Sequence, residues 1–149
     1  MRITSTIAAL LKSKPQKIWS ISPDATVFDA IELMAGKNIG AVPVMNHGKL
    51  LGILSERDYT RKIALEGKSS HSTSVGEIIS PDFISVSPDS IIDECMHLMT
   101  EHRIRHLPVL QTGELVGIIS IGDLVNWIIS AQDIAIEQLE NFIAGAYPS

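Results

Sequence analysis

The amino-acid sequence repeats itself after 65 residues. When the chain is shifted by 65 positions, 15 of the 39 consecutive positions from Ser20 to Asp58 meet an identical residue, and no gap is needed. Unrelated sequences match at roughly one position in fifteen to twenty at ordinary residue frequencies. The chain is therefore expected to fold as two copies of one structural unit.

Each copy is predicted to begin with a short strand and a helix. The strands are expected at Ile18–Ile21 and Phe83–Val86, and each is followed by a proline, which cannot donate to a ladder of hydrogen bonds. The helices are expected over Val27–Met34 and Ile92–Met99, where apolar residues recur at i, i+3, i+4 and i+7. This spacing directs one apolar face of each helix toward a core.

A hairpin and a second helix complete each copy. Gly48 and Gly113 each lie in a short polar segment between two apolar segments, which is the pattern of a β-hairpin. The second helix is expected to begin at Ser55 in the first copy and at Ser120 in the second. Because a unit of about 60 residues is marginally stable alone, the two β-α-β-β-α units are expected to pack sheet to sheet with pseudo-two-fold symmetry. The expected fold class is α/β (α+β).

The expected domain boundaries follow the repeat. Residues 7–65 form the first unit, residues 75–130 form the second, and residues 131–149 form a C-terminal helical extension. The last helix is predicted from about Gly122 to Ala144, and its apolar residues occupy more than one stripe. An exposed apolar surface usually marks a contact with a partner, so we expect a homodimer.

Composition excludes several classes of protein. The chain is 45% hydrophobic and 19% charged, which is typical of a folded domain, and its net charge of −5 argues against a nucleic-acid or anionic membrane partner. The single cysteine, Cys95, excludes an intrachain disulfide and favours a reducing compartment, so a cytoplasmic location is predicted. The five histidines have no partners at metal-binding spacing, and no nucleophile is paired with a base. Neither a metal site nor an enzyme is expected.

The segments Gly52–Asp58 and Gly117–Asp123 share the pattern Gly-h-x-Ser-x-x-Asp, in which h is apolar. The glycine would let a ligand approach the strand, and the serine would lie beside free N–H groups of a helix N-terminus, where phosphate binds. The aspartate can accept hydrogen bonds from the hydroxyls of a ribose, each worth about 1.5–3 kcal/mol. Ser-x-x-Asp is also the spacing of a capping box, which needs no ligand. Both interpretations stay open.

Other short motifs accompany this pattern in both copies. Ser-Pro-Asp occurs at residues 22–24 and 87–89, and the tripeptides Val-Pro-Val and Leu-Pro-Val occur at 42–44 and 107–109. Together these motifs resemble a tandem pair of CBS (cystathionine-β-synthase) domains, known as a Bateman module. The likeness is strongest to stand-alone CBS-pair proteins, whose first copy often reads as Ser55–Lys62 does here.

The resemblance implies a regulatory, ligand-sensing module that is not an enzyme. It would bind an adenine nucleotide (AMP, ADP, ATP or NAD) in the cleft between the two repeats, with no other cofactor required. Binding would modulate an unidentified regulated protein or the module's own assembly as a homodimer. The alternative is a structural or protein-interaction module without a physiological ligand.

The resemblance also assigns the nucleotide to a set of residues from both copies. The set is Trp19, Ser20, Ala41, Val42, Ser55, Arg57, Asp58, Ile84, Arg105, His106, Leu107, Ser120 and Asp123. Trp19 and Ile84 occupy positions that line the adenine pocket in the family. The aromatic ring of Trp19 could stack on a base or pack in the core.

The two clefts are expected to differ in their affinity for phosphate. Arg105 and His106 occupy positions from which the family reaches the phosphates, but their counterparts in the first copy are the uncharged Gly40 and Ala41. Arg57 could compensate in the first copy. The open alternatives are a solvated helix end for Arg103 and Arg105 and a surface or core role for His106.

Overall fold

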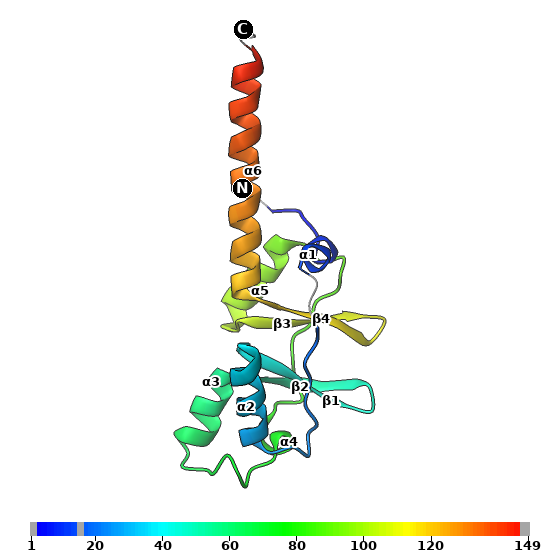
Figure 1. Cartoon of the computed structure of the whole chain (residues 1–149). Coiled ribbons are helices and arrows are strands. Elements are labelled where there is room, and N and C mark those ends of the chain that lie inside the picture. The colour runs from blue at the N-terminus through cyan, green and yellow to red at the C-terminus, as the bar shows by residue number, and fades with distance from the viewer. Residues whose placement is uncertain (1–2, 15–16, 147–149) are drawn as a thin grey trace.

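Figure 1 shows a computed structural model of the chain, which describes residues 3–14 and 17–146. Each copy contributes a helix, a two-stranded hairpin and a further helix, and strands β2 and β4 of the two hairpins contact each other. The elements, in chain order, are α1 (Ile7–Ser13), α2 (Val27–Lys37), β1 (Ala41–Asn46), β2 (Lys49–Ser55), α3 (Glu56–Asp58), the π-helix η1 (Tyr59–Ala64), α4 (Val75–Ile78), α5 (Ile92–His102), β3 (His106–Gln111), β4 (Glu114–Ser120) and α6 (Ile121–Ala146).

The two hairpins are antiparallel and have equivalent registers. Their turns contain two consecutive residues with positive φ: His47 and Gly48 at 51° and 77°, and Thr112 and Gly113 at 50° and 81°. Positive φ at both central residues defines a type I′ turn, whose twist matches that of the flanking strands. The predicted hairpins and the two-repeat fold class are confirmed.

The first strand expected in each copy is reduced to a single bridge. Ile21 pairs with Val44 in the parallel sense, and its N–H donates to the Pro43 carbonyl at 3.0 Å. The ladder could extend toward the N-terminus only if residue 43 donated an N–H, which proline lacks. Pro108 stands in the same place beside Val86 in the second copy. The prediction of whole strands at 18–21 and 83–86 is therefore wrong.

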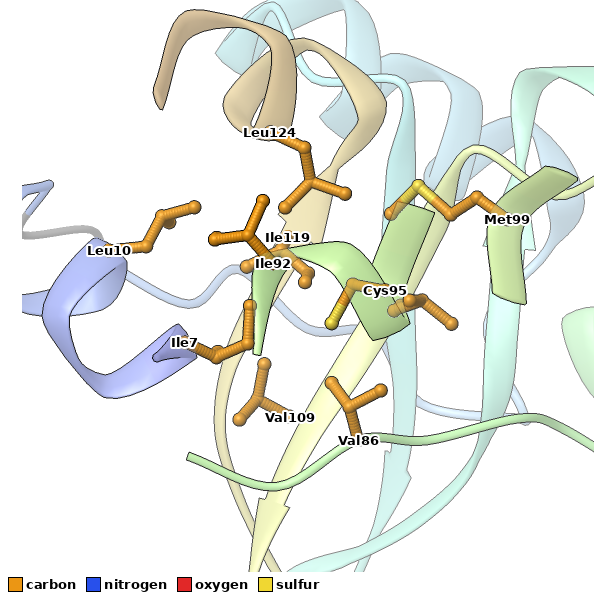
Figure 2. Close-up of a cluster of buried hydrophobic side chains, with 10 residues drawn as sticks. Ile7, Leu10, Val86, Ile92, Cys95, Met99, Val109, Ile119 and Leu124 are labelled. Atoms are coloured by element: carbon orange, nitrogen blue, oxygen red, sulfur yellow. The ribbon is translucent and has the colours of Figure 1, made fainter. Parts of the chain in front are cut away.

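Helix α1 packs against the second copy, although it precedes the first in the sequence. Ile7 and Leu10 are buried in the same hydrophobic core as Ile92 and Leu124, as Figure 2 shows. The backbone makes the same connection, because the Ile7 N–H donates to the Ser90 carbonyl at 2.8 Å. Complete burial of one such aliphatic side chain is worth about 1.5–3 kcal/mol.

Helix α4 makes the reciprocal contact with the first copy. Val75 and Ile78 lie in a core with Val27 and Leu54, and the Val75 N–H donates to the Ala25 carbonyl at 2.8 Å. The helix that precedes one copy in the sequence thus completes the core of the other copy. This exchange makes the two repeats one interdependent body.

Helix α6 follows β4 directly and runs for 26 residues without a break at residue 130. Its first turns cover the core of the second copy, and the rest extends away from the body (Figure 1). Within the described parts of the chain, no helix combines the length and the apolar character needed to cross a membrane.

Candidate functional site

The Ser-x-x-Asp segments form capping boxes in both copies. Ser55 Oγ accepts from the Asp58 N–H at 3.2 Å, and Asp58 Oδ2 accepts from the Ser55 N–H at 2.9 Å. The equivalent distances for Ser120 and Asp123 are 3.1 and 2.8 Å. The capping interpretation is confirmed. Each capping box uses only the Oδ2 oxygen of its aspartate. The Oδ1 oxygen therefore stays available for a ligand or another partner.

The second carboxylate oxygen, Oδ1, has different surroundings in the two copies. Asp58 Oδ1 lies 3.7 Å from Lys62 Nζ, which also donates to a backbone carbonyl at 2.8 Å. Asp123 Oδ1 forms a close ion pair with Lys14, which follows α1. The side chain of Asp58 is 28% exposed and that of Asp123 is 10% exposed. Asp58 therefore offers the more accessible acceptor.

A cavity of about 970 Å³ opens beside Asp58, between the two copies. Ser55 and Asp58 line it from the first copy, and Phe83, Ile84 and Arg105 line it from the second. Its size lies within the range of roughly 300–1,000 Å³ that is typical of small-molecule sites. The fold thus joins the Ser-x-x-Asp segment of one repeat to an apolar and cationic wall of the other.

The lining of this larger cavity carries more positive than negative charge, although the whole chain has a net charge of −5. The cations are Arg57, Arg61, Lys62, Arg103 and Arg105, and the carboxylates are Glu56, Asp58 and Asp82. Guanidinium groups form strong, charge-assisted hydrogen bonds with phosphate. The cavity is therefore suited to a ligand that combines an anionic group with hydrogen-bond donors for Asp58.

Arg57 connects the two copies at this cavity. Its Nη1 donates to the backbone carbonyl of Arg103 at 2.8 Å. Arg103 ends helix α5 in the left-handed conformation, with φ of 54°, which turns the chain toward β3. A ligand that draws Arg57 toward itself would compete with this contact between the repeats.

A smaller cavity, of about 260 Å³, lies beside Asp123. Ser120 and Asp123 line it from the second copy, and Ile18, Trp19 and Ala41 line it from the first. The arrangement mirrors the larger cavity, as pseudo-two-fold symmetry requires. Its volume lies just below the usual range for a small-molecule site.

Two lysines cover the aromatic ring of Trp19 at this smaller cavity. The ammonium groups of Lys17 and Lys37 lie 4.5 and 4.0 Å from the ring centroid, within the range of a cation–π contact. Trp19 is half-buried and belongs to neither hydrophobic core. A base that stacked on a face covered by one of these ammonium groups would have to displace it.

His106 lines both cavities. Burial lowers the pKa of its imidazole below the usual 6.5, although the charges of Asp123 and Glu56 act in the opposite direction; nearby Arg105 lowers it further. The ring also lies against the backbone of Gly40, where an added Cβ would meet its Cε1 at 3.3 Å. His106 is thus neutral near pH 7 and occupies the junction between the two candidate sites.

The structure brings most of the predicted residues to one or other cavity. Those at the larger cavity are Ser55, Arg57, Asp58, Ile84, Arg105 and His106, and those at the smaller cavity are Trp19, Ala41, Ser120, Asp123 and again His106. Val42 and Leu107 are completely buried in the cores, and Ser20 is exposed and lines neither cavity.

Several residues at these cavities were not predicted from the sequence. Lys62 has a local signal, because it lies four residues after Asp58 on the same helical segment. Lys14 has none, because its contact with Asp123 spans 109 residues. Phe83 was predicted as a strand residue, and only the packing of the second repeat brings it to the cavity of the first.

The expectation for the two motif glycines is wrong. A Cβ at Gly52 would lie 3.1 Å from the Ser80 carbonyl, and a Cβ at Gly117 would lie 2.8 Å from the Leu11 side chain. These glycines therefore allow close packing against Ser80, which follows α4, and against Leu11 of α1. They do not open the strands to a ligand.

Among the described residues, neither Cys95 nor the possible metal ligands form a further site. Burial, followed by the charge of Glu94, raises the pKa of the Cys95 thiol to about 11, so this thiol stays protonated and behaves as a core residue. In residues 3–14 and 17–146 no group of three or more histidine, cysteine or acidic side chains could hold a metal ion.

Comparison with known proteins agrees with this architecture. The family model of the CBS domain matches residues 13–65 and 75–130, so the chain belongs to the CBS-domain family and carries two such domains. CBS-pair proteins are generally regulatory and often bind nucleotides.

Individual relatives show the same tandem arrangement. The mitochondrial CBS domain-containing protein CBSX3 of Arabidopsis thaliana is 38% identical over 154 residues, covering 97% of this chain and 74% of the relative. A solved CBS-domain protein from Burkholderia ambifaria is 49% identical, with a TM-score of 0.82, covering 86% of this chain and 96% of the other. The hexameric CBS-CP12 protein from bloom-forming cyanobacteria is 25% identical, with a TM-score of 0.73, covering 98% and 91%. That the protein is not an enzyme stays a prediction from the sequence.

Proposed function

We propose that this protein is a ligand-sensing regulatory module that binds an adenine nucleotide (AMP, ADP, ATP or NAD) in the larger cavity between its repeats. The observation that carries the proposal concerns the Oδ1 oxygen of Asp58. The capping box does not use this oxygen, and it lies at a cavity to which the other repeat contributes positively charged side chains. A nucleotide has both complementary parts, because its ribose donates hydrogen bonds and its phosphates accept them.

Each part of the nucleotide has a candidate partner. The ribose hydroxyls would donate to Asp58 Oδ1, and the phosphates would accept from Arg57 and Arg105. Phe83 and Ile84 would supply the apolar surface for the base. These residues belong to different repeats, so the bound nucleotide would bridge them.

This bridging is the proposed source of regulation. A ligand shifts a conformational equilibrium only by its difference in affinity for the two states. Phosphate binding by Arg57 would compete with its bond to the Arg103 carbonyl, so occupied and empty cavities would differ in how the repeats are joined. That difference would be transmitted to a regulated protein partner or to a second copy of the chain.

We also propose that the protein works as a homodimer. The apolar side chains of α6 that remain exposed support this assembly, among them Leu139 and Phe142, at 58% and 73%. A cytoplasmic location, the absence of a required cofactor and the absence of nucleic-acid or membrane partners stay predictions from the sequence.

Calorimetry with a panel of adenine nucleotides tests the ligand. An Asp58→Asn variant keeps an oxygen for the cap but loses the charge, and Asp123→Asn is the matched control in the other copy. We expect binding to the wild-type protein, at least tenfold weaker binding to Asp58→Asn, since a charge-assisted bond is worth about 1.5–3 kcal/mol, and a smaller effect in the control. Mass spectrometry of small molecules released from the purified protein would identify the nucleotide.

The alternative function is a structural or interaction module without a ligand. The completeness of both capping boxes favours it, because Ser55, Asp58, Ser120 and Asp123 already have structural partners. No binding of any nucleotide at millimolar concentration, with normal thermal unfolding, would establish this alternative and overturn the proposed ligand.

A further inference from the structure

The first turns of α6 and the rest of the helix have different surroundings. Leu124 is completely buried, and Trp127 and Ile128 pack against the core of the second copy. Beyond these residues the helix projects from the body (Figure 1). Along one side it nevertheless remains strongly apolar.

Five of the exposed apolar residues of α6, together with Gln132, follow a heptad pattern, whereas Ile134 and Phe142 lie outside it. Successive members are alternately four and three residues apart, as required for one continuous seam along a supercoiled helix. The seam is Val125, Ile129, Gln132, Ile136, Leu139 and Ile143. Its aliphatic members are between 40% and 58% exposed. Val125 belongs to the part of the helix that packs on the body, so the seam stays accessible even there.

The residue types at the seam specify two helices. With the +4 and +3 steps assigned to heptad positions, isoleucine occupies position a at Ile129, Ile136 and Ile143. Leu139 and Val125 occupy position d, which Gln132 interrupts once. β-branched residues at a with leucine at d favour a parallel, two-stranded coiled coil.

Gln132 favours a parallel orientation for a second reason. In a parallel pair each d residue faces its own counterpart, so two glutamine amides meet and can hydrogen-bond to each other. In an antiparallel pair a d residue faces an a residue, and the amide of Gln132 would meet an isoleucine. A buried amide without a partner is costly, and one polar pair in a seam commonly selects the register.

The charges beside the seam agree with this orientation. Asp133 and Glu140 occupy position e, and α6 contains no lysine or arginine. An antiparallel pair would bring the e positions of the two helices together and place these carboxylates near one another. A parallel pair instead sets each e position against position g of the other helix, which holds the apolar Ala135 and Phe142.

We propose that residues 125–143 of α6 form a parallel two-stranded coiled coil with α6 of a second copy of this chain. This surface rests on the homodimer in the proposed function and makes it specific. It does not depend on nucleotide binding. The two bodies would then lie at the same end of the paired helices.

The mass of the full chain in solution tests the seam. The wild-type protein is expected at twice its monomer mass of 16.2 kDa. Ile136→Glu and Leu139→Glu place a charge in the seam and should shift the mass to that of the monomer at the same concentration. Asn141→Glu, on the side of α6 opposite the seam, is the matched control and should remain dimeric. Circular dichroism of each variant checks that the body stays folded.

Disulfide crosslinking tests the orientation. In a parallel pair the Ile143→Cys variant places two thiols face to face, and a mild oxidant such as copper phenanthroline should link them. Asn141→Cys is the control and should not crosslink. The native Cys95 is buried and contributes no background.

The possible outcomes separate this surface from the wider proposal. A dimer that persists in both glutamate variants, or a crosslink that forms only when Val125→Cys is added to Ile143→Cys, overturns the parallel coiled coil while leaving a homodimer. A wild-type monomer at all concentrations overturns both the surface and the homodimer. Nucleotide calorimetry is a separate measurement and is unaffected by either result.

Discussion

Lys14 and Asp123, which are 109 residues apart in the sequence, form a close ion pair between the Lys14 ammonium group and the Oδ1 oxygen of Asp123. The equivalent oxygen of Asp58 has only a looser contact, 3.7 Å from Lys62 Nζ. The two repeats therefore present the same motif in two electrostatic states. In the first copy the Oδ1 oxygen of Asp58 is accessible. In the second copy Lys14, which follows α1, already neutralises the charge of Asp123.

The first prediction concerns this asymmetry. Calorimetry of the wild-type protein should show unequal nucleotide sites, with the tighter site at Asp58. Lys14→Ala frees Asp123 Oδ1 and should raise the affinity of the weaker site. The loss of a partly exposed ion pair should lower stability by only about 0–1 kcal/mol. Two identical, independent sites in the wild-type protein would contradict the prediction.

The second prediction separates the capping and ribose roles of Asp58. Asp58→Ala removes both carboxylate oxygens, so it should lower stability by about 0.5–2 kcal/mol through the cap and nucleotide affinity by roughly 10–100-fold through the ribose. Asp123→Ala should show the same loss of stability with a smaller loss of affinity. Thermal unfolding and calorimetry on both variants make the comparison. Unchanged affinity in both would leave capping as the whole role.

The third prediction concerns pH. Burial lowers the pKa of His106 in the folded protein below 6.5, so the unfolded chain takes up a proton first as the pH falls. The folded state should therefore lose stability as the pH drops below about 6.5, toward the lower folded pKa. His106→Gln should make the melting temperature less dependent on pH in this window. An identical pH profile in wild type and His106→Gln would refute the assignment.

The fourth prediction concerns the exchange of helices between the repeats. Leu10→Ala in α1 should destabilise the protein by about 2–5 kcal/mol, because Leu10 is buried in the core of the second copy. Denaturant unfolding should remain a single transition. The reason is that α1, which precedes the first copy, packs in the core of the second, and α4, which precedes the second copy, packs in the core of the first. Leu65→Ala, at a position that is 77% exposed, is the control and should change stability by less than about 0.5 kcal/mol. Two separate transitions would show that the copies fold independently.

The local features of the fold could be predicted from the sequence. The 65-residue repeat, the hairpins around Gly48 and Gly113 and the capping boxes depend on residues close together in the chain. Backbone conformation and short-range hydrogen bonding determine such features.

Tertiary packing decided the features that the motifs did not predict. Proline at positions 43 and 108 limits each expected first strand to one bridge. The backbone N–H that proline lacks would be needed only to continue a parallel ladder with the neighbouring segment, so the effect depends on that neighbour. The motif glycines contact the chain's own segments instead of a ligand, since α1 and α4 lie across their strands.

The sequence by itself determined the repeat, the elements of each copy and the two Ser-x-x-Asp boxes, because these depend on neighbours within a few residues. Only the tertiary structure decided which repeat α1 and α4 pack against and which residues of the other repeat face each Ser-x-x-Asp segment. It also decided which of the two aspartates forms a close ion pair with a lysine. The physical reason is that burial and charge pairing act between surfaces brought together by the whole fold. Lys14 shows this most directly, because no local pattern connects it to Asp123.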